Sequence, residues 1–151
     1  KYIKKNLNYV SKRIGAKKIV LLHQVHGKKI HSLNNISNKK LIGDGIITSA
    51  RGIGIGILTA DCAPVLFFDY KKNIAGALHA GWRGAYKKIA KKMVNCFKKK
   101  GSKLSNIVAV IGPCISQNNY EVKNEFKNKF LAQDLKNKKY FKKTKNKIFL
   151  I

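Results

Sequence analysis

Short apolar runs rich in isoleucine and valine recur along the chain, and turn-forming residues follow each of them. Runs of this length and β-branched content predict strands. In the run 53–58 glycine alternates with isoleucine, so one face of the strand carries no side chains and another layer must pack closely against it. We expect six strands, of which the first, fifth and sixth are buried: 19–22, 45–48, 53–58, 65–69, 74–78 and 107–111.

Stretches with helical periodicity lie before, between and after these runs. We expect a short helix over 7–14 that stops at Gly15, a longer one over 85–97 that is opened by a loop at 81–84 and closed by Gly101, and a third over 122–131. The polar segment 28–40 is expected to be a loop. With neither a repeat nor a linker, the pattern predicts a single α/β layered domain over residues 1–151.

The size and composition suit one cytoplasmic domain. A chain of 151 residues with 44% hydrophobic residues can bury a core, and no apolar run approaches the roughly 20 residues that cross a bilayer. The start of the chain has no export signal. The three cysteines are odd in number and not clustered, which fits a reducing compartment; we place Cys96 in the core, and Cys114 either in a structural role or near the site.

A formal net charge of +27 suggests a partner rich in phosphates. However, recognition of bases and phosphates favours the bidentate guanidinium, and the arginines are only Arg13, Arg51 and Arg83. The lysines are spread through every segment. We therefore interpret the charge as solvated surface and expect a monomer without a nucleic-acid or membrane partner, and we keep an inactive basic nucleic-acid-binding fragment as the alternative outside the enzymes.

Three motifs follow strand-like runs: Gln24-Val25-His26-Gly27, Thr59-Ala60-Asp61-Cys62-Ala63-Pro64-Val65 and His79-Ala80-Gly81-Trp82-Arg83-Gly84. Two imidazoles and one thiolate can hold zinc with a fourth position open, and such a zinc ion lowers the pKa of bound water to about 7. We therefore predict that His26, Cys62 and His79 are metal ligands. Without a metal, His79 would instead deprotonate Cys62 for nucleophilic hydrolysis.

Two charged residues accompany these motifs. Asp61 either orients a ligand and transfers a proton or caps backbone groups in the turn before Pro64. Arg83 lies at an expected helix start, where an anion such as phosphate or carboxylate is favoured, or it covers Trp82 at the surface. We name Cys62, His79, Asp61 and Arg83 as candidate catalytic residues.

The motifs at 24–27, 59–65 and 79–84, together with Ile-Gly-Pro-Cys-Ile-Ser at 111–116 and Tyr120-Glu121-Val122, resemble in order and spacing the bacterial YfiH-like family. This family is also called the laccase-domain or polyphenol oxidase family, and its members are described as purine nucleoside phosphorylases. The resemblance covers nearly all of this chain but not all of the family's domain. We expect N- and C-terminal parts of that domain to be missing, because Lys1 is not an initiator Met and the chain stops on the apolar run 148–151.

The resemblance implies an α/β/β/α sandwich with mixed sheets, similar to the cytotoxic necrotizing factor catalytic domain. It places the family's metal-binding His, Cys and His on His26, Cys62 and His79. It implies phosphorolysis of adenosine, inosine, guanosine and methylthioadenosine with phosphate as the second substrate, and deamination of adenosine. Zinc is the expected cofactor; an older label implies copper-dependent phenol oxidation, although multicopper oxidases need more than the four histidines present.

Overall fold

The computed structural model describes residues 2–35, 40–144 and 147–150. These residues fall into two compact units, one within 1–113 and the other within 114–151. The first unit carries all three motifs that contain the predicted metal ligands.

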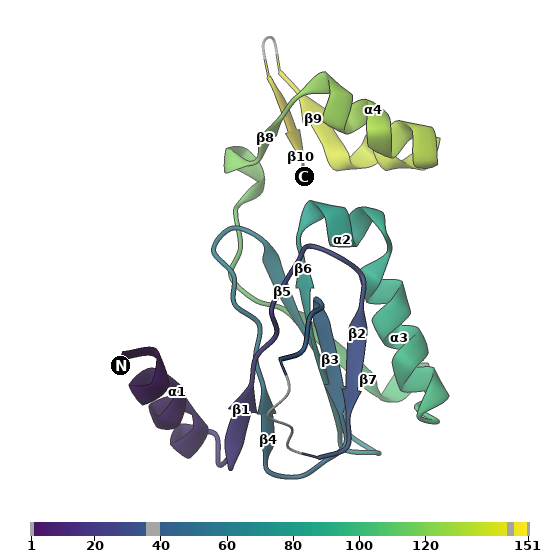
Figure 1. Ribbon diagram of the computed structural model, residues 1–151. Coiled ribbons are helices and arrows are strands. Elements are labelled where there is room, and N and C mark those ends of the chain that lie inside the picture. The colour runs from purple at the N-terminus through teal and green to yellow at the C-terminus, as the bar shows by residue number, and fades with distance from the viewer. Residues whose placement is uncertain (1, 36–39, 145–146, 151) are drawn as a thin grey trace. The chain divides into compact units, whose positions relative to one another are not determined.

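Among the described residues, the first unit begins with a helix, continues with six strands and two helices, and ends with a seventh strand (Figure 1). In chain order they are α1 (Tyr2–Arg13), β1 (Lys18–Val20), β2 (Ile30–Leu33), β3 (Gly45–Thr48), β4 (Ile53–Ile55), β5 (Ala63–Asp69), β6 (Ile74–Ala80), α2 (Trp82–Tyr86), α3 (Ile89–Lys99), the 3₁₀ turn η1 (Leu104–Asn106) and β7 (Ile107–Ile111). Five strands form one sheet in the order β2-β3-β6-β5-β7, and β1 pairs with β4 separately. The β2–β3 and β1–β4 pairs are parallel and the others antiparallel, so the predicted mixed α/β fold is confirmed.

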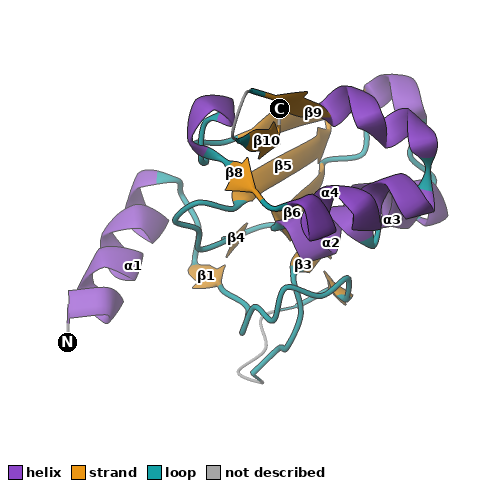
Figure 2. Ribbon diagram, turned by 90° about the horizontal axis from the view of Figure 1, so that it is seen from above, coloured by secondary structure: helices purple, strands orange, loops and turns teal. Residues whose placement is uncertain are grey.

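One face of the five-stranded sheet packs against α3 and forms the main core (Figure 2). Phe67 of β5 lies against Phe97 of α3, with ring centroids 6.1 Å apart. Ile89, Met93 and Phe97 are fully buried. Gly76 of β6 allows this approach, because a Cβ atom there would lie 2.8 Å from the Phe97 ring. The helix therefore buries the apolar face that its periodicity predicted.

The opposite face of the sheet is covered in part by the β1–β4 pair. Ile46 of β3 is fully buried and belongs to the same apolar cluster as Val20 of β1. In β4, a Cβ atom on Gly54 would lie 3.1 Å from the Ile14 side chain. The expected close packing against the glycine face of the run 53–58 is thus confirmed.

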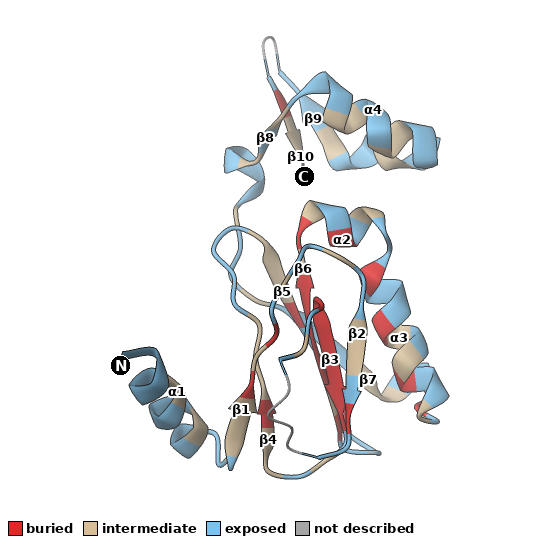
Figure 3. Ribbon diagram, viewed as in Figure 1, coloured by how far each residue is buried: buried red, intermediate tan, exposed pale blue. Residues whose placement is uncertain are grey.

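The prediction that 107–111 is a buried strand is wrong, although the strand itself is present as β7. This strand is the last in the sheet order. Its Val108 and Val110 align with Phe68 and Leu66 of β5, and all four side chains are between 44% and 57% exposed (Figure 3). The β1–β4 layer covers the same face over β3 but leaves it open over β5 and β7. An apolar run predicts a strand without revealing whether a second layer reaches it.

The predicted helix 85–97 and the predicted loop 28–40 also differ from the structure. The helix expected over 85–97 is interrupted, since α2 ends at Tyr86 and Lys88 adopts a left-handed backbone with φ 59° before α3 begins. The segment 28–40 contains a strand, β2, which pairs with β3. Its polar residues His31 and Ser32 give β2 too little apolar alternation for recognition.

The second unit is a small α/β element. Its members are the 3₁₀ turn η2 (Gln117–Asn119), β8 (Glu121–Val122), α4 (Asn124–Gln133), the 3₁₀ helix η3 (Leu135–Tyr140), β9 (Phe141–Lys143) and β10 (Ile148–Leu150). The strands form an antiparallel sheet in the order β8-β10-β9. Phe126 and Phe130 of α4 pack together and against Phe141. The helix predicted over 122–131 starts later than expected, because Val122 belongs to β8.

The remaining predictions concern cysteines and membranes. Cys96 is partly buried and packs against the main core, as expected, whereas Cys114 is exposed in the second unit. None of the helices in the described ranges has the length and apolar content that a membrane crossing requires.

Candidate metal centre

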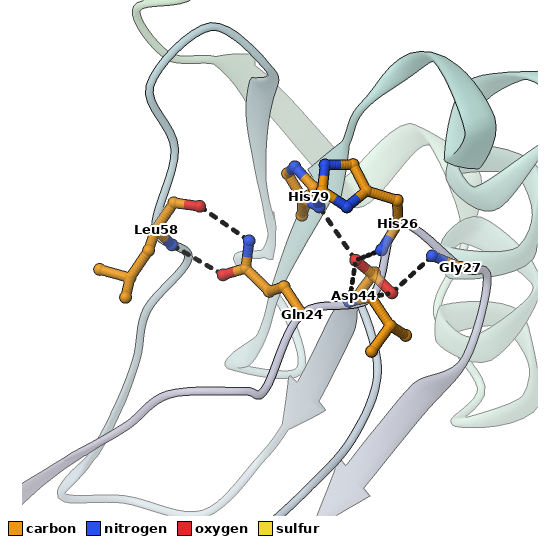
Figure 4. A network of polar contacts seen from close by, with 7 residues as sticks. Gln24, His26, Gly27, Asp44, Leu58 and His79 are labelled. Atoms are coloured by element: carbon orange, nitrogen blue, oxygen red, sulfur yellow. Dashed lines mark hydrogen bonds and ion pairs between the residues drawn. The ribbon is translucent and has the colours of Figure 1, made fainter.

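His26 lies on the loop between β1 and β2, where it adopts an unusual backbone conformation. Its φ of 55° is left-handed, which a residue with a side chain rarely adopts without support. The support is the carboxylate of Asp44, which accepts hydrogen bonds from the backbone N–H groups of Val25 (3.2 Å), His26 (2.9 Å) and Gly27 (2.7 Å) (Figure 4). This anchored loop presents the exposed His26 imidazole at the edge of the sheet.

Cys62 and His79 are positioned by the pairing of β5 with β6. In this antiparallel pair Ala63 faces Ala80, and Pro64 faces His79. Cys62, just before β5, therefore lies beside Gly81, just after β6. His79 is 3% exposed and Cys62 is partly buried.

Gln24 links the first two motifs. Its side-chain N–H donates to the Leu58 carbonyl at 2.7 Å, and its side-chain oxygen accepts from the Leu58 N–H at 2.9 Å (Figure 4). This pair of bonds ties the loop that carries His26 to the segment that leads to Cys62.

The three predicted ligands meet at one place. One donor atom each from His26, Cys62 and His79 lies within 4.8 Å of the others. The two imidazole rings meet edge to face, with centroids 4.7 Å apart. Metal–nitrogen and metal–sulfur bonds are about 2.0–2.3 Å long, so one ion could contact all three after small side-chain rotations.

Gly81 keeps this place open. A Cβ atom on Gly81 would lie 2.9 Å from the Cys62 sulfur, 3.1 Å from Cδ2 of His26 and 3.5 Å from Cε1 of His79. The backbone of Gly81 has φ −66° and ψ 162°, which any residue adopts. Glycine is therefore required here for space between the three donors and not for backbone freedom, and the donor set and its spacing fit a transition-metal ion.

Asp44 is the residue of this site that the sequence reasoning missed. Its carboxylate is fully buried, and Oδ1 lies 2.9 Å from Nδ1 of His79. Burial alone would raise the pKa of Asp44, but the hydrogen bonds from His79 and from the backbone of Gly27, Val25 and His26 together lower the pKa below its usual value. The available signal was an acidic residue between two glycines, Gly43-Asp44-Gly45, directly before a strand.

The electrostatics at Cys62 are unfavourable for a free thiolate. Burial, and then the negative charge of the neighbouring Asp61, raise the pKa of the Cys62 thiol. Asp61 itself is exposed. In the absence of a cation the thiol is therefore protonated at neutral pH, whereas a coordinated metal ion deprotonates a thiol.

Arg83 lies on the short helix α2 that follows Gly81. Its guanidinium stacks over the ring of Trp82, at 5.3 Å from the ring centroid, and the side chain is exposed. The contact with Trp82, one of the two alternatives for Arg83, is therefore present, and a role for Arg83 in anion binding stays a prediction. The other histidines stand outside the cluster: His23 bridges to Ile42, and Nε2 of His31 lies 2.9 Å from the Ile42 carbonyl.

The first unit has a mixed α/β fold, and two imidazoles and a thiol lie around one glycine. The fold and this cluster together define a class: mixed α/β proteins with a candidate open transition-metal centre. The family model described as multi-copper polyphenol oxidoreductase laccase matches residues 1–150. The chain belongs to this family, and the resemblance stated from its motifs is confirmed.

Three known proteins illustrate the relationship. A purine nucleoside phosphorylase of Rickettsia conorii is 37% identical over 139 residues, which are 92% of this chain and 57% of the relative. An adenosine deaminase named RL5, from an unknown prokaryotic organism, is 40% identical over 67 residues, which are 44% of this chain and 26% of the relative. The crystal structure of the Bacillus licheniformis hypothetical protein YfiH is 26% identical, with a TM-score of 0.84 over 97% of this chain and 60% of that one.

The solved structure bears out the fold class. The chain spans 57% of the length of the Rickettsia relative and 60% of the YfiH chain. The activities in the relatives' names belong to those longer proteins.

Proposed function

We propose that this chain is the metal-binding part of a zinc-dependent purine nucleoside phosphorylase that also deaminates adenosine. The observation that carries the proposal is the convergence of His26, Cys62 and His79 around Gly81. The names of the relatives, purine nucleoside phosphorylase and adenosine deaminase, support the reaction class. The proposed substrates are adenosine, inosine, guanosine and methylthioadenosine with phosphate.

Zinc is the metal that we propose, with copper as the alternative. Two histidines and one cysteine with an open position form a donor set found around catalytic zinc. Two histidines and one cysteine also bind copper in electron-transfer sites, usually with a weak methionine ligand. The single methionine of the chain, Met93, is fully buried in the core cluster with Ile89 and Phe97 of α3. This supports zinc.

In phosphorolysis a phosphate oxygen bonds to the anomeric carbon of the ribose, the bond from that carbon to the purine breaks, and the purine leaves with a proton. When bound, the metal would supply Lewis-acid stabilisation of an oxygen atom of a substrate or of water. Stacking on Trp82 uses the flat face of the Arg83 guanidinium and leaves the N–H donors at its edge suited to phosphate. We propose that Arg83 binds the phosphate. We propose that the exposed carboxylate of Asp61 carries out the proton transfer.

A Cys–His hydrolase is the second candidate, and one observation favours it. Cys62, His79 and Asp44 are arranged in the manner of a nucleophile, a base and an orienting carboxylate. The raised pKa of Cys62 opposes this candidate, because hydrolases of this kind depend on a lowered thiol pKa.

The test combines metal content with turnover by the purified chain. Under the proposal the chain binds one equivalent of zinc and converts inosine to hypoxanthine only when phosphate is present, and it converts adenosine to inosine. Cys62→Ala and His79→Ala remove both zinc and turnover, whereas Cys96→Ala, at a cysteine outside the cluster, retains both.

Three outcomes would contradict the proposal in different ways. Zinc binding without nucleoside turnover would refute the enzymatic assignment and leave the metal centre standing. An intense visible sulfur-to-copper absorption band in protein supplied with both metals would favour copper. Turnover by metal-free protein that is lost on alkylation of Cys62 would favour the hydrolase.

A further inference from the structure

We propose that Asp44 is the positioning residue of the centre, and that its one carboxylate orients both histidine ligands. The inference rests on the proposed metal site but not on the identity of the substrate. We assign Asp44 no contact with the ion or with a nucleoside; it acts through His79 and through the loop that carries His26.

The first contact fixes the ring of His79. Nδ1 of His79 lies 2.9 Å from Oδ1 of Asp44. An ionised carboxylate only accepts hydrogen bonds, so Nδ1 carries a proton, and in the neutral imidazole Nε2 then keeps its lone pair. Nε2 is then the nitrogen left for a metal ion. In metal sites a carboxylate behind a histidine fixes the tautomer and the ring orientation in this way.

The main chain strengthens the same link. The N–H group of His79 donates to the carbonyl oxygen of Asp44 at 2.8 Å. This bond continues the pairing of β3 with β6, in which Gly45 faces Leu78. Both the backbone and the ring of His79 are therefore set against Asp44.

The second set of contacts fixes the loop that carries His26. The carboxylate accepts from three successive backbone N–H groups, those of Val25, His26 and Gly27, at 2.7–3.2 Å. The left-handed backbone of His26 is unfavourable for a residue with a side chain unless its surroundings compensate. The bonds to the carboxylate provide that compensation, so the position of the His26 imidazole depends on Asp44.

The chain is tightly packed on both sides of Asp44. The side chain is fully buried. A Cβ atom on Gly43 would lie 2.9 Å from the Lys29 carbonyl oxygen, and one on Gly45 would lie 2.8 Å from the Ile30 side chain. A buried carboxylate is stabilised only if its oxygens are satisfied, and here both oxygens accept hydrogen bonds from elements that carry the ligands.

The test measures zinc affinity by chelator competition in the full chain and in Asp44→Asn and Asp44→Ala. Removing such a supporting carboxylate typically weakens metal binding about 10- to 100-fold. We expect a loss in this range for Asn, which keeps one acceptor oxygen, and a larger loss for Ala. Asp69→Asn is the matched control, since Asp69 is equally buried and accepts from the N–H groups of Lys71 and Lys72, but lies outside the metal cluster.

If the role of Asp44 were purely structural, its replacement would change the stability of the protein but not the tautomer of His79. The second readout is therefore the tautomer of His79 in metal-free protein, measured by ¹⁵N NMR. We expect the Nδ1–H form in the unsubstituted chain and a mixture in Asp44→Asn. Finding the Nε2–H form in the unsubstituted chain would overturn the inference, even if the variants failed to fold.

The two proposals fail separately. Absence of zinc binding by the unsubstituted chain refutes the metal centre of the proposed function. Equal zinc affinity of Asp44→Asn and the unsubstituted chain refutes the role of Asp44 and leaves the metal centre intact. An equal loss in Asp69→Asn would also refute it, because the effect would then follow from a buried carboxylate in general.

Discussion

The replacement Gly81→Ala is expected to abolish metal binding while leaving the fold intact. The new Cβ atom would lie 2.9 Å from the Cys62 sulfur. Non-bonded heavy atoms are in ordinary contact from about 3.5 Å, so the sulfur must retreat by about 0.6 Å. Metal–ligand distances tolerate about 0.2 Å, so this displacement is about three times too large. Removal of a residue that only supports a metal ligand weakens metal binding by up to about 100-fold. We expect the zinc affinity of Gly81→Ala to fall by more than this.

The fold should tolerate the same change. Alanine adopts the backbone angles of Gly81 without strain. Replacing glycine by alanine at a helix start destabilises the protein, whereas the smaller entropy of the unfolded chain stabilises it. Because the two effects oppose each other, the free energy of unfolding should change by no more than about 1 kcal/mol.

The assay pairs chelator competition for zinc with urea unfolding of the metal-free protein. Gly54→Ala is the matched control, because its Cβ atom would meet only the aliphatic side chains of Ile14, Ala16 and Ile19. This control should lose stability and keep its zinc affinity. If Gly81→Ala bound zinc as tightly as the unsubstituted chain, the three donors would not share an ion beside Gly81, and the reasoning about this site would be refuted.

Three further predictions test the surroundings of the site. Phe67→Ala should lower the free energy of unfolding by about 3–5 kcal/mol, and Phe68→Ala by about 1 kcal/mol or less, because Phe67 is 6% exposed and Phe68 is 44% exposed; equal losses in urea unfolding would contradict the layer assignment. Gln24→Ala removes both bonds to the Leu58 backbone and should weaken zinc binding in chelator competition, with a stability loss of about 1 kcal/mol. In metal-free protein at pH 8, Asp61→Asn should speed alkylation of Cys62 by iodoacetamide, since the Asp61 charge contributes to the raised pKa of that thiol; an unchanged rate would exclude this contribution.

Local patterns in the sequence were sufficient to predict most strands and to single out three side chains that the structure brings together. The strands at 45–48 and 74–78 were predicted from β-branched and apolar runs, because buried strands are selected for such side chains. His26, Cys62 and His79 were singled out because each is a potential metal ligand that follows such a run.

The errors concern properties that depend on neighbours distant in the chain. The exposure of β7 depends on how far the β1–β4 layer extends, which no pattern within 107–111 encodes. The helix break at Lys88 was hidden because apolar periodicity continues on both sides of it. Asp44 was overlooked because an acidic residue beside glycine is typical of turns, and only the fold brings it to His79, 35 residues later.

The geometry of the candidate site divides its three proposed ligands into two kinds. Cys62 and His79 are held by the register of β5 with β6, which many backbone hydrogen bonds and the main core maintain. His26 is held by a loop, whose conformation depends on hydrogen bonds to a single carboxylate. Because that carboxylate also orients His79, any displacement of the His26 loop changes the hydrogen bonding behind the second histidine. The loop and the sheet therefore form one unit around the proposed metal site, although their residues lie far apart in the sequence.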